Sequence, residues 1–250
     1  MSGFARWAID SAIEDWPSVQ RCNECLQRLV ARRLTEVTAT GAAETSKTAW
    51  KCAVLQQALL YRATSLASGT ADAWNAENII CAVIAARALM ETVALADCVV
   101  DEIIRNLQAE NVVEIDDFVN RQLFATRNEQ QVLEGYGFHA KSVIKYISNF
   151  DKKIDGVSDA YSFLCEFAHP NGSGHFMSFG ELDRATGTVR FTDAGQRVKA
   201  LQHHVVTAFF LLAFMEPALD AFDRVIPQIS KVDGFTDPWI NDPSSFRRSR

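Results

Sequence analysis

The sequence lacks the short motifs by which many enzymes are recognised. It contains no G-x-x-x-x-G-K-[ST] phosphate loop, no G-x-G-x-x-G, no G-x-S-x-G and no H-E-x-x-H. These motifs supply the phosphate cradle, the dinucleotide turn, the nucleophile elbow and the zinc ligands of large enzyme classes. Their absence leaves nucleotide-dependent and hydrolytic activities of those classes without support.

The sequence also lacks a positive net charge and a secretion signal. Its 250 residues carry a formal net charge of -6. This charge argues against a broad surface that coats nucleic acid, but not against a small basic pocket. The first residues, Met-Ser-Gly-Phe, are not a basic segment followed by an apolar run, so no signal peptide is expected.

Long uncharged apolar runs are missing as well. The stretch 79–100 contains Arg87, Glu91 and Asp97, and the stretch 205–215 is followed at once by an acidic residue and a proline. A membrane-spanning helix needs about 20 consecutive apolar residues. Both stretches are therefore interpreted as buried core helices, and a cytoplasmic protein without membrane contact is expected.

The cysteines form no recognisable metal or disulfide framework. Six are present, at positions 22, 25, 52, 81, 98 and 165. Without a secretion signal, disulfides are not expected. Cys22 and Cys25 form a C-x-x-C, but it lies within a helical pattern and has no second pair, so they are interpreted as small core residues.

Proline and glycine are scarce, and the abundant residues favour helix. There are 6 prolines and 12 glycines, whereas Ala, Leu, Glu, Gln and Arg are common. Apolar residues recur at helical spacing. They predict helices near 4–15, 18–39, 45–67, 73–108, 115–125, 139–150, 158–168 and 194–222. Residues 126–138 are expected to form a loop or a short helix.

A β-hairpin is expected before the last helix. In FMSFGELDRATGTVRF, residues 176–191, the turn DRATG has glycine where a positive φ is needed, and an alternating strand pattern follows. Asp193 is expected to cap the last helix. The predicted fold class is all-α, a helical bundle with one inserted hairpin. We expect one domain over residues 1–230 and an irregular tail over 231–250.

The first candidate site is Arg87 and Glu91, which lie four residues apart and so share a helix face. Their neighbours are apolar, where a charge is costly unless it is paired or functional. One interpretation is a salt bridge, or two side chains that reach solvent, in a packing role. The other is a site in which Arg87 holds an anion while Glu91 orients the anion or a histidine.

The second candidate is YSFLCEFAHPNGSGH, residues 161–175, where a helix meets a loop. Glu166 and His169 share a helix face, and Pro170 stops the helix. His169 either caps the last carbonyls of the helix or acts as a general acid or base. The candidate binding residues beside them are Tyr161, Asn171 and His175.

Metal binding is a weaker alternative for the same region. Glu166 and His169 form an E-x-x-H, which is half of a di-metal motif of helical bundles, but the sequence has no second copy and only Glu91 as an extra carboxylate. Zinc could instead be held by ligands drawn from Cys165, His169, His175 and His139. The main expectation is a site without metal or cofactor.

Two adjacent histidines, His203 and His204, begin the apolar run of the last helix. Adjacent helical residues point about 100° apart, so at most one of them can join a shared site. They are interpreted as core or boundary histidines with satisfied hydrogen bonds.

Together, the motifs resemble a known superfamily. R-x-x-x-E lies in a long apolar helix, and Y-x-x-L-x-E-x-x-H-P-N, from Tyr161 to Asn171, precedes a hairpin. Over residues 75–215 this arrangement resembles a group of bacterial helical proteins and, through them, the HEPN superfamily. HEPN proteins are helical bundles, commonly dimeric, and many are metal-independent ribonucleases of toxin–antitoxin, phage-defence or RNA-processing systems.

The resemblance implies a catalytic site. His169 would move a proton to or from an RNA 2′-hydroxyl, Arg87 would stabilise the charged phosphorane, and Glu91 or Glu166 would orient them. In the HEPN signature an arginine shortly precedes the histidine in one helix, whereas residues 162–164 are Ser, Phe and Leu here, so Arg87 would come from another helix.

The resemblance also implies partners: an RNA substrate, a second copy in a homodimer or other homo-oligomer, and an antitoxin or defence-system protein. The residues themselves leave a different class of function open. The chain could be a non-catalytic sensor, ligand-binding or assembly module, in which the cluster of Arg87, Glu91, Glu166 and His169 is structural. Whether Arg87 and His169 meet in space separates the two.

Overall fold

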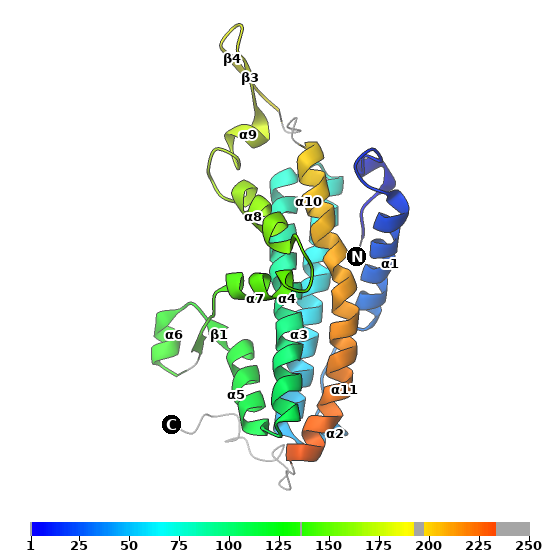
Figure 1. Cartoon of the computed structure of the whole chain (residues 1–250), viewed down its shortest axis with the longest axis vertical. Coiled ribbons are helices and arrows are strands. Elements are labelled where there is room, and N and C mark those ends of the chain that lie inside the picture. The colour runs from blue at the N-terminus through cyan, green and yellow to red at the C-terminus, as the bar shows by residue number, and fades with distance from the viewer. Residues whose placement is uncertain (1, 136, 193–197, 234–250) are drawn as a thin grey trace. The chain divides into compact units, whose positions relative to one another are not determined.

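A computed structural model describes residues 2–135, 137–192 and 198–233 of the chain. These residues are mostly helical, as Figure 1 shows. The helices are α1 (Trp16–Ala31), α2 (Ala42–Thr45), α3 (Lys47–Asn75), α4 (Ile79–Gln108), α5 (Val112–Leu123), α6 (Glu129–Leu133), α7 (Val143–Asp151), α8 (Val157–Ala168), α9 (Phe176–Phe179), α10 (Val198–Phe210) and α11 (Met215–Asp233). Strands β3 (Gly180–Asp183) and β4 (Thr188–Phe191) form the hairpin. The all-α prediction with a hairpin before the last long helix is confirmed.

The chain divides into two compact units. Unit 1 comprises Met1–Arg32, Leu60–Leu95 and Val143–Glu216, and unit 2 comprises Arg33–Leu59, Ala96–Ser142 and Pro217–Arg250. The long helices α3 and α4 contribute to both units, because the unit boundaries fall within them. A single domain over residues 1–230 stays a prediction.

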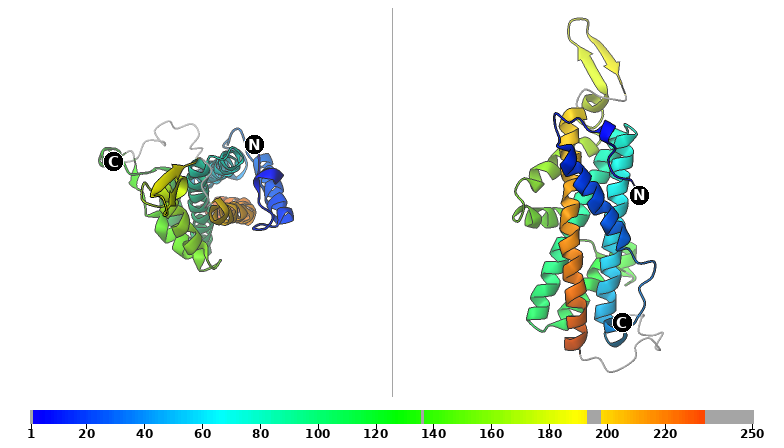
Figure 2. Two further views of the ribbon diagram at one scale, coloured as in Figure 1. Left: turned by 90° about the horizontal axis from the view of Figure 1, so that it is seen from above. Right: turned by 90° about the vertical axis from the view of Figure 1, so that its right-hand side faces the viewer.

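Unit 1 holds the candidate catalytic and binding residues that the sequence singled out. In it α8 packs against α7 and α10, and α1 packs against α10 and the 3-10 turn η2 (Leu211–Phe214). Figure 2 shows α1 beside α10 in both views. The buried side chains include Leu89, Phe150, Leu164, Leu201 and Phe209. Burial of such side chains contributes about 1.5–3 kcal/mol each, so this core fixes the position of α8 relative to α4.

The N-terminal segment 2–15, here called the strap, is not the predicted helix. Only the 3-10 turn η1 (Arg6–Ala8) is helical near its start. Three side-chain amides take the place of helical hydrogen bonds, since each accepts from a strap N–H and donates to a strap carbonyl. They are Asn23 at Phe4, Asn75 at Ala5 and Gly3, and Gln202 at Asp10. The buried Phe4 and Ile9 hold the strap against the core.

Two further helix boundaries differ from the prediction. The helix expected to reach residue 39 ends at Ala31, and the next segment is held by other groups, since the Leu34 N–H donates to the Gln57 side chain. The helix expected to end before Gly69 continues to Asn75. Its stripe of buried side chains continues from Ala67, before the glycine, to Ala71 and Trp74 after it. This packing outweighs the poor helix propensity of glycine.

The last predicted helix, 194–222, is divided and runs further. Helix α10 ends at Phe210, the 3-10 turn η2 follows, and α11 continues to Asp233. Pro217 has no N–H to bond the carbonyl four residues earlier, which favours a break in the α-helical pattern just before it. Asp193, the predicted cap, lies outside the described residues. So does the predicted tail, except that residues 231–233 continue α11.

Unit 2 contains a small feature that the sequence did not reveal. Strands β1 (Ala125–Thr126) and β2 (Phe138–His139) pair in parallel, and α6 lies between them in the chain. The core of this unit includes Ile103, Ile115 and Ile229. Residues 126–138, expected to be a loop or a short helix, therefore contain both a short helix and strand pairing.

Two helical segments are long and apolar enough to cross a membrane, by length and composition alone. They are Ile79–Gln108 and Leu201–Asp233, and 56% and 61% of their most apolar windows are buried in the structure. Core helices of soluble proteins pass the same test. The structure is therefore compatible with the interpretation of both stretches as core helices.

Candidate functional site

Arg87 and Glu91 on α4 form one hydrogen-bonded cluster with Tyr161 on α8. The Tyr161 hydroxyl donates to Glu91 Oε1 at 2.8 Å and accepts from Arg87 Nε and Nη2 at 3.4 Å each. Arg87 Nε lies 3.3 Å from Glu91 Oε1, so the predicted pair on one helix face is present. The guanidinium carbon also lies 5.6 Å from the Tyr161 ring centroid. We call these three residues the α4–α8 cluster.

The α4–α8 cluster is largely withdrawn from water. Tyr161 is 8% exposed, and the Arg87 and Glu91 side chains are 29% and 19% exposed. Burial, supported by the Glu91 carboxylate, raises the pKa of Tyr161 to about 12. Burial alone would lower the pKa of Arg87, but the hydrogen bond to Tyr161 and the nearby acidic groups raise it. Neither residue therefore changes protonation near neutral pH.

Asn171 organises the loop that follows α8. Its Nδ2 donates to Glu166 Oε2 at 2.9 Å, and its Oδ1 accepts from the Gly174 N–H at 2.9 Å. Its own N–H donates to the His169 carbonyl at 2.8 Å. A Cβ at Gly174 would lie 1.9 Å from the His169 carbonyl oxygen, so only glycine fits this close backbone approach. Much of the sequence after Pro170 is thus explained by loop geometry.

The two loop histidines belong to neither group. The His169 and His175 side chains are exposed, and within the described ranges neither imidazole makes a hydrogen bond or an ion pair. His169 lies two helical turns beyond Tyr161, which is about 12 Å along the axis of α8. The structure therefore joins Arg87, Glu91 and Tyr161 in one place and Glu166 with Asn171 in another.

Searches of family models, curated proteins and solved structures give no match to this chain. The HEPN resemblance consequently depends on the quoted motifs alone. Function has to be argued from the geometry of the chain itself.

The C-x-x-C of α1 is part of a packing cluster. Burial, together with Glu216, raises the pKa of Cys25 to about 12, and burial raises that of Cys22 to about 11. Arg28 binds Glu216 with two hydrogen bonds, of 2.8 and 3.0 Å. Thiols with such pKa values are neutral at pH 7 and poor nucleophiles. Cys25 is buried, as the interpretation as a core residue predicts, whereas Cys22 is only half-buried.

The adjacent histidines of α10 have different environments. His203 Nδ1 lies 2.8 Å from Glu14 Oε1, and its side chain is 62% exposed. The His204 ring stacks on Phe163 of α8 with centroids 3.9 Å apart. Its Nδ1 is buried and has no hydrogen-bond partner in the described part of the chain. The expectation of satisfied hydrogen bonds therefore holds for His203 but not for His204. Burial and the neighbouring His203 lower the pKa of His204.

Unit 2 contains a polar network that sequence reasoning missed. Lys51 Nζ binds both carboxylate oxygens of Asp116, at 2.7 and 2.9 Å, and Thr48 and Asn120 donate to the same carboxylate. The Lys51 side chain is only 12% exposed. A lysine within an apolar helical stripe was the available signal, but its partner lies 65 residues away and could not be identified by spacing.

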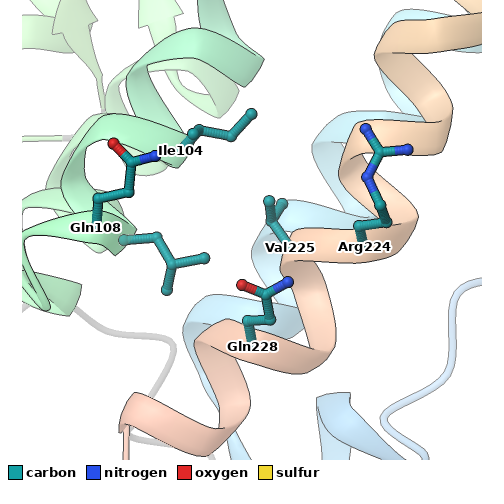
Figure 3. A pocket seen from close by; sticks show the side chains of 6 residues that line it. Ile104, Gln108, Arg224, Val225 and Gln228 are labelled. Carbon is teal, nitrogen blue, oxygen red and sulfur yellow. The ribbon is translucent and has the colours of Figure 1, made fainter.

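A shallow pocket also lies in unit 2, shown in Figure 3. Its volume is about 260 Å³, somewhat below the range of typical ligand sites. It is lined by Ile104, Leu107, Gln108, Arg224, Val225 and Gln228. None of the candidate site residues lines it.

The described residues give no support to the alternative of a metal site. Among the residues that the structure describes, no three His, Cys, Asp or Glu side chains lie close enough together to hold a metal ion. Of the ligands considered above, Glu166 is hydrogen-bonded to Asn171. The carboxylate–histidine metal protein therefore has no geometric argument in its favour.

Proposed function

We propose that this chain is a non-catalytic assembly module, in which the α4–α8 cluster is a structural lock between two helices. The observation that carries the proposal is the position of Arg87. Its guanidinium is bonded to the Tyr161 hydroxyl, two turns of α8 before His169. A phosphorane-stabilising arginine must contact the same phosphate that the histidine serves.

The chemistry of the lock supports a structural role. Arg87, Glu91 and Tyr161 bond one another across two helices. Partly buried polar groups that satisfy one another in this way specify one arrangement of the helices. The protein would act in the cytoplasm, since more than half of the most apolar window of each long apolar segment is buried.

An RNA-cleavage assay tests the proposal directly. The purified chain and the His169→Ala variant are incubated with a mixed-sequence single-stranded RNA, and product is quantified over time. We expect no cleavage above the buffer rate and no difference between the two proteins. Cleavage by the wild-type chain that disappears in His169→Ala, with an unchanged circular dichroism spectrum, would overturn the non-catalytic role.

A metal-independent ribonuclease of a defence or toxin–antitoxin system is the second candidate, favoured by one observation. His169 and His175 are both exposed, and the contact of Gly174 with the His169 carbonyl closes the loop between them. Histidine is the side chain that most often serves as general acid or general base, and this loop carries two of them. This function predicts cleavage that resists a chelator, has a bell-shaped pH profile and is lost in His175→Ala as well. Cleavage retained in His175→Ala would contradict it.

A further inference from the structure

The hairpin that follows α9 is amphipathic. Its register pairs Gly180 with Phe191 and Leu182 with Val189, while Glu181 pairs with Arg190 and Asp183 with Thr188. Side chains alternate between the faces of a sheet, and paired residues share a face. One face of the hairpin is therefore apolar and the other carries its charged and hydroxyl groups. Figure 1 shows the hairpin extending from α9, away from α8.

Phe176 of α9 extends the apolar face. A Cβ at Gly180 would meet the Phe176 ring at 2.9 Å, so the ring covers Gly180 on the same face as Leu182 and Val189. All four large side chains of this face are exposed: Phe176 by 40%, Leu182 by 48%, Val189 by 37% and Phe191 by 70%. We call them the hairpin strip.

A further strand or a cover would stabilise the hairpin. An isolated two-stranded hairpin is only marginally stable in water, and a third strand or a packed helix is normally required. Within the part of the chain that the structure describes, this sheet contains β3 and β4 alone. All four residues of β4 are exposed. Among the described residues no strand pairs with the outer edge of β4, so this edge can accept a further strand.

The balanced charge of the hairpin favours a second copy of this chain as the occupant, and the small apolar area means that the strand edge must make most of the contact. The hairpin strip exposes roughly 350 Å² by side-chain size, well below the roughly 800 Å² per partner of a stable interface. Main-chain hydrogen bonds along an edge would therefore have to supply affinity. The hairpin has two acidic residues, Glu181 and Asp183, and two basic residues, Arg184 and Arg190, whereas the whole chain carries -6. Two hairpins can meet without net repulsion.

The charges also select the edge and the register. Pairing of β3 with a second β3 would set Glu181 and Asp183 against each other or against themselves, which is unfavourable. Pairing of β4 about a two-fold axis at Arg190 would set two arginines opposite each other. An axis at Val189 instead places Val189 beside Val189 of the partner subunit, and Thr188 beside Arg190 of the partner subunit. Both apolar strips then lie on one face.

We propose that β4 pairs antiparallel with β4 of a second copy about a two-fold axis at Val189, to form a four-stranded sheet. The inference rests on the assembly role proposed above and names its partner. It makes the dimer isologous, the commonest form of homo-oligomer. With so little apolar area, the dimer is weak and depends on concentration.

Disulfide trapping tests the register. In a Cys81→Ser background, which removes the exposed native thiol, Val189→Cys places two Cα atoms about 4.5–5.5 Å apart, within reach of a disulfide. The matched control is Leu182→Cys, on the same face of β3, where three strand spacings separate the two copies by about 14 Å. We expect covalent dimer with Val189→Cys only. Equal trapping at both positions, or trapping at neither, overturns the proposal.

Thr188→Arg tests the charge argument. It sets an arginine beside Arg190 of the partner subunit twice, while inside the hairpin it faces Asp183 and favours the native pairing. We expect dimerisation, measured by sedimentation velocity over a concentration series, to weaken about threefold to tenfold. Unchanged dimerisation overturns this register, and a wild-type chain that stays monomeric overturns the second copy as occupant. The assembly role itself fails only on His169-dependent RNA cleavage.

Discussion

The middle of α8 and its C-terminal end use polar side chains in different ways. Tyr161 reaches another helix, where Arg87 and Glu91 bond to it. Glu166 at the end of α8 bonds to Asn171, five residues further along the same chain segment. The first arrangement joins elements that are distant in sequence, and the second shapes one loop. A group of ionisable residues at a helix end is therefore no sign of a site until another element is found to contact it.

The largest expected effect is a difference in the free energy of unfolding between variants in the middle of α8 and at its C-terminal end. Tyr161→Ala removes a buried aromatic ring and the hydroxyl that joins α4 to α8, and should lower the free energy of unfolding by about 3 kcal/mol. His169→Ala, in the exposed end, should change it by less than about 0.5 kcal/mol. Guanidinium denaturation measures both. Similar losses in the two variants would mean that the two parts are equally structural.

Gly174→Ala is expected to have the next largest effect. The new Cβ would overlap the His169 carbonyl oxygen, so the loop backbone has to move. A loss of about 2 kcal/mol is expected, as for other overpacked sites, with faster amide exchange in residues 169–178. Gly172→Ala is the matched control, because no atom lies within 4 Å of its added Cβ. Equal amide exchange rates in residues 169–178 of the two variants would contradict the close approach of Gly174 to the His169 carbonyl.

A double-mutant cycle sharpens the comparison further. Arg87→Met combined with Tyr161→Phe should show a coupling energy of about 1 kcal/mol, because the two side chains share a hydrogen bond in a partly buried place. A second cycle, Arg87→Met with His169→Ala, should show coupling near zero. Coupling in the second cycle would place Arg87 and His169 in one network and revive the catalytic interpretation.

The smallest effect is expected at His204 of α10, which stacks on Phe163 of α8. Burial lowers its pKa below the ordinary 6.5, so the neutral form is favoured in the folded state. Its stabilising contribution is complete above pH 6.5 and is lost as the pH falls below that value, because the unfolded chain takes up the proton first. The melting temperature of wild type should therefore drop more between pH 7.5 and 5.5 than that of His204→Leu.

The helical fold could be predicted because its signals are local. Apolar periodicity located the main helices, and the turn DRATG located the hairpin, whose Gly187 has a φ of +68°. The strap could not be predicted, since Asn23, Asn75 and Gln202 satisfy its backbone from distant positions. Local propensity cannot reveal hydrogen bonds that distant side chains supply.

The candidate site could be predicted only in part, for the same reason. Spacing placed Arg87 and Glu91 on one helix face, and their ion pair is present. Their partner Tyr161 was singled out as a binding residue, but its connection to Glu91 spans 70 residues and no spacing rule covers it. Asn171 was named as a binding residue too, although its side chain is occupied by Glu166 and Gly174. Residue type indicates what a side chain can bond, and only the fold indicates what it does bond.

The strap has a consequence for the order in which the protein forms during synthesis. Asp10 is held by Gln202, and the two residues are separated by 192 positions in the chain. At about 5–20 residues per second, the ribosome needs roughly 10–40 seconds to make the later partner. The part of the strap around Asp10 must therefore wait until α10 emerges, whereas Asn23 and Asn75 can hold its start earlier. Asp10 thus reaches its final place only after residues that are made much later in synthesis.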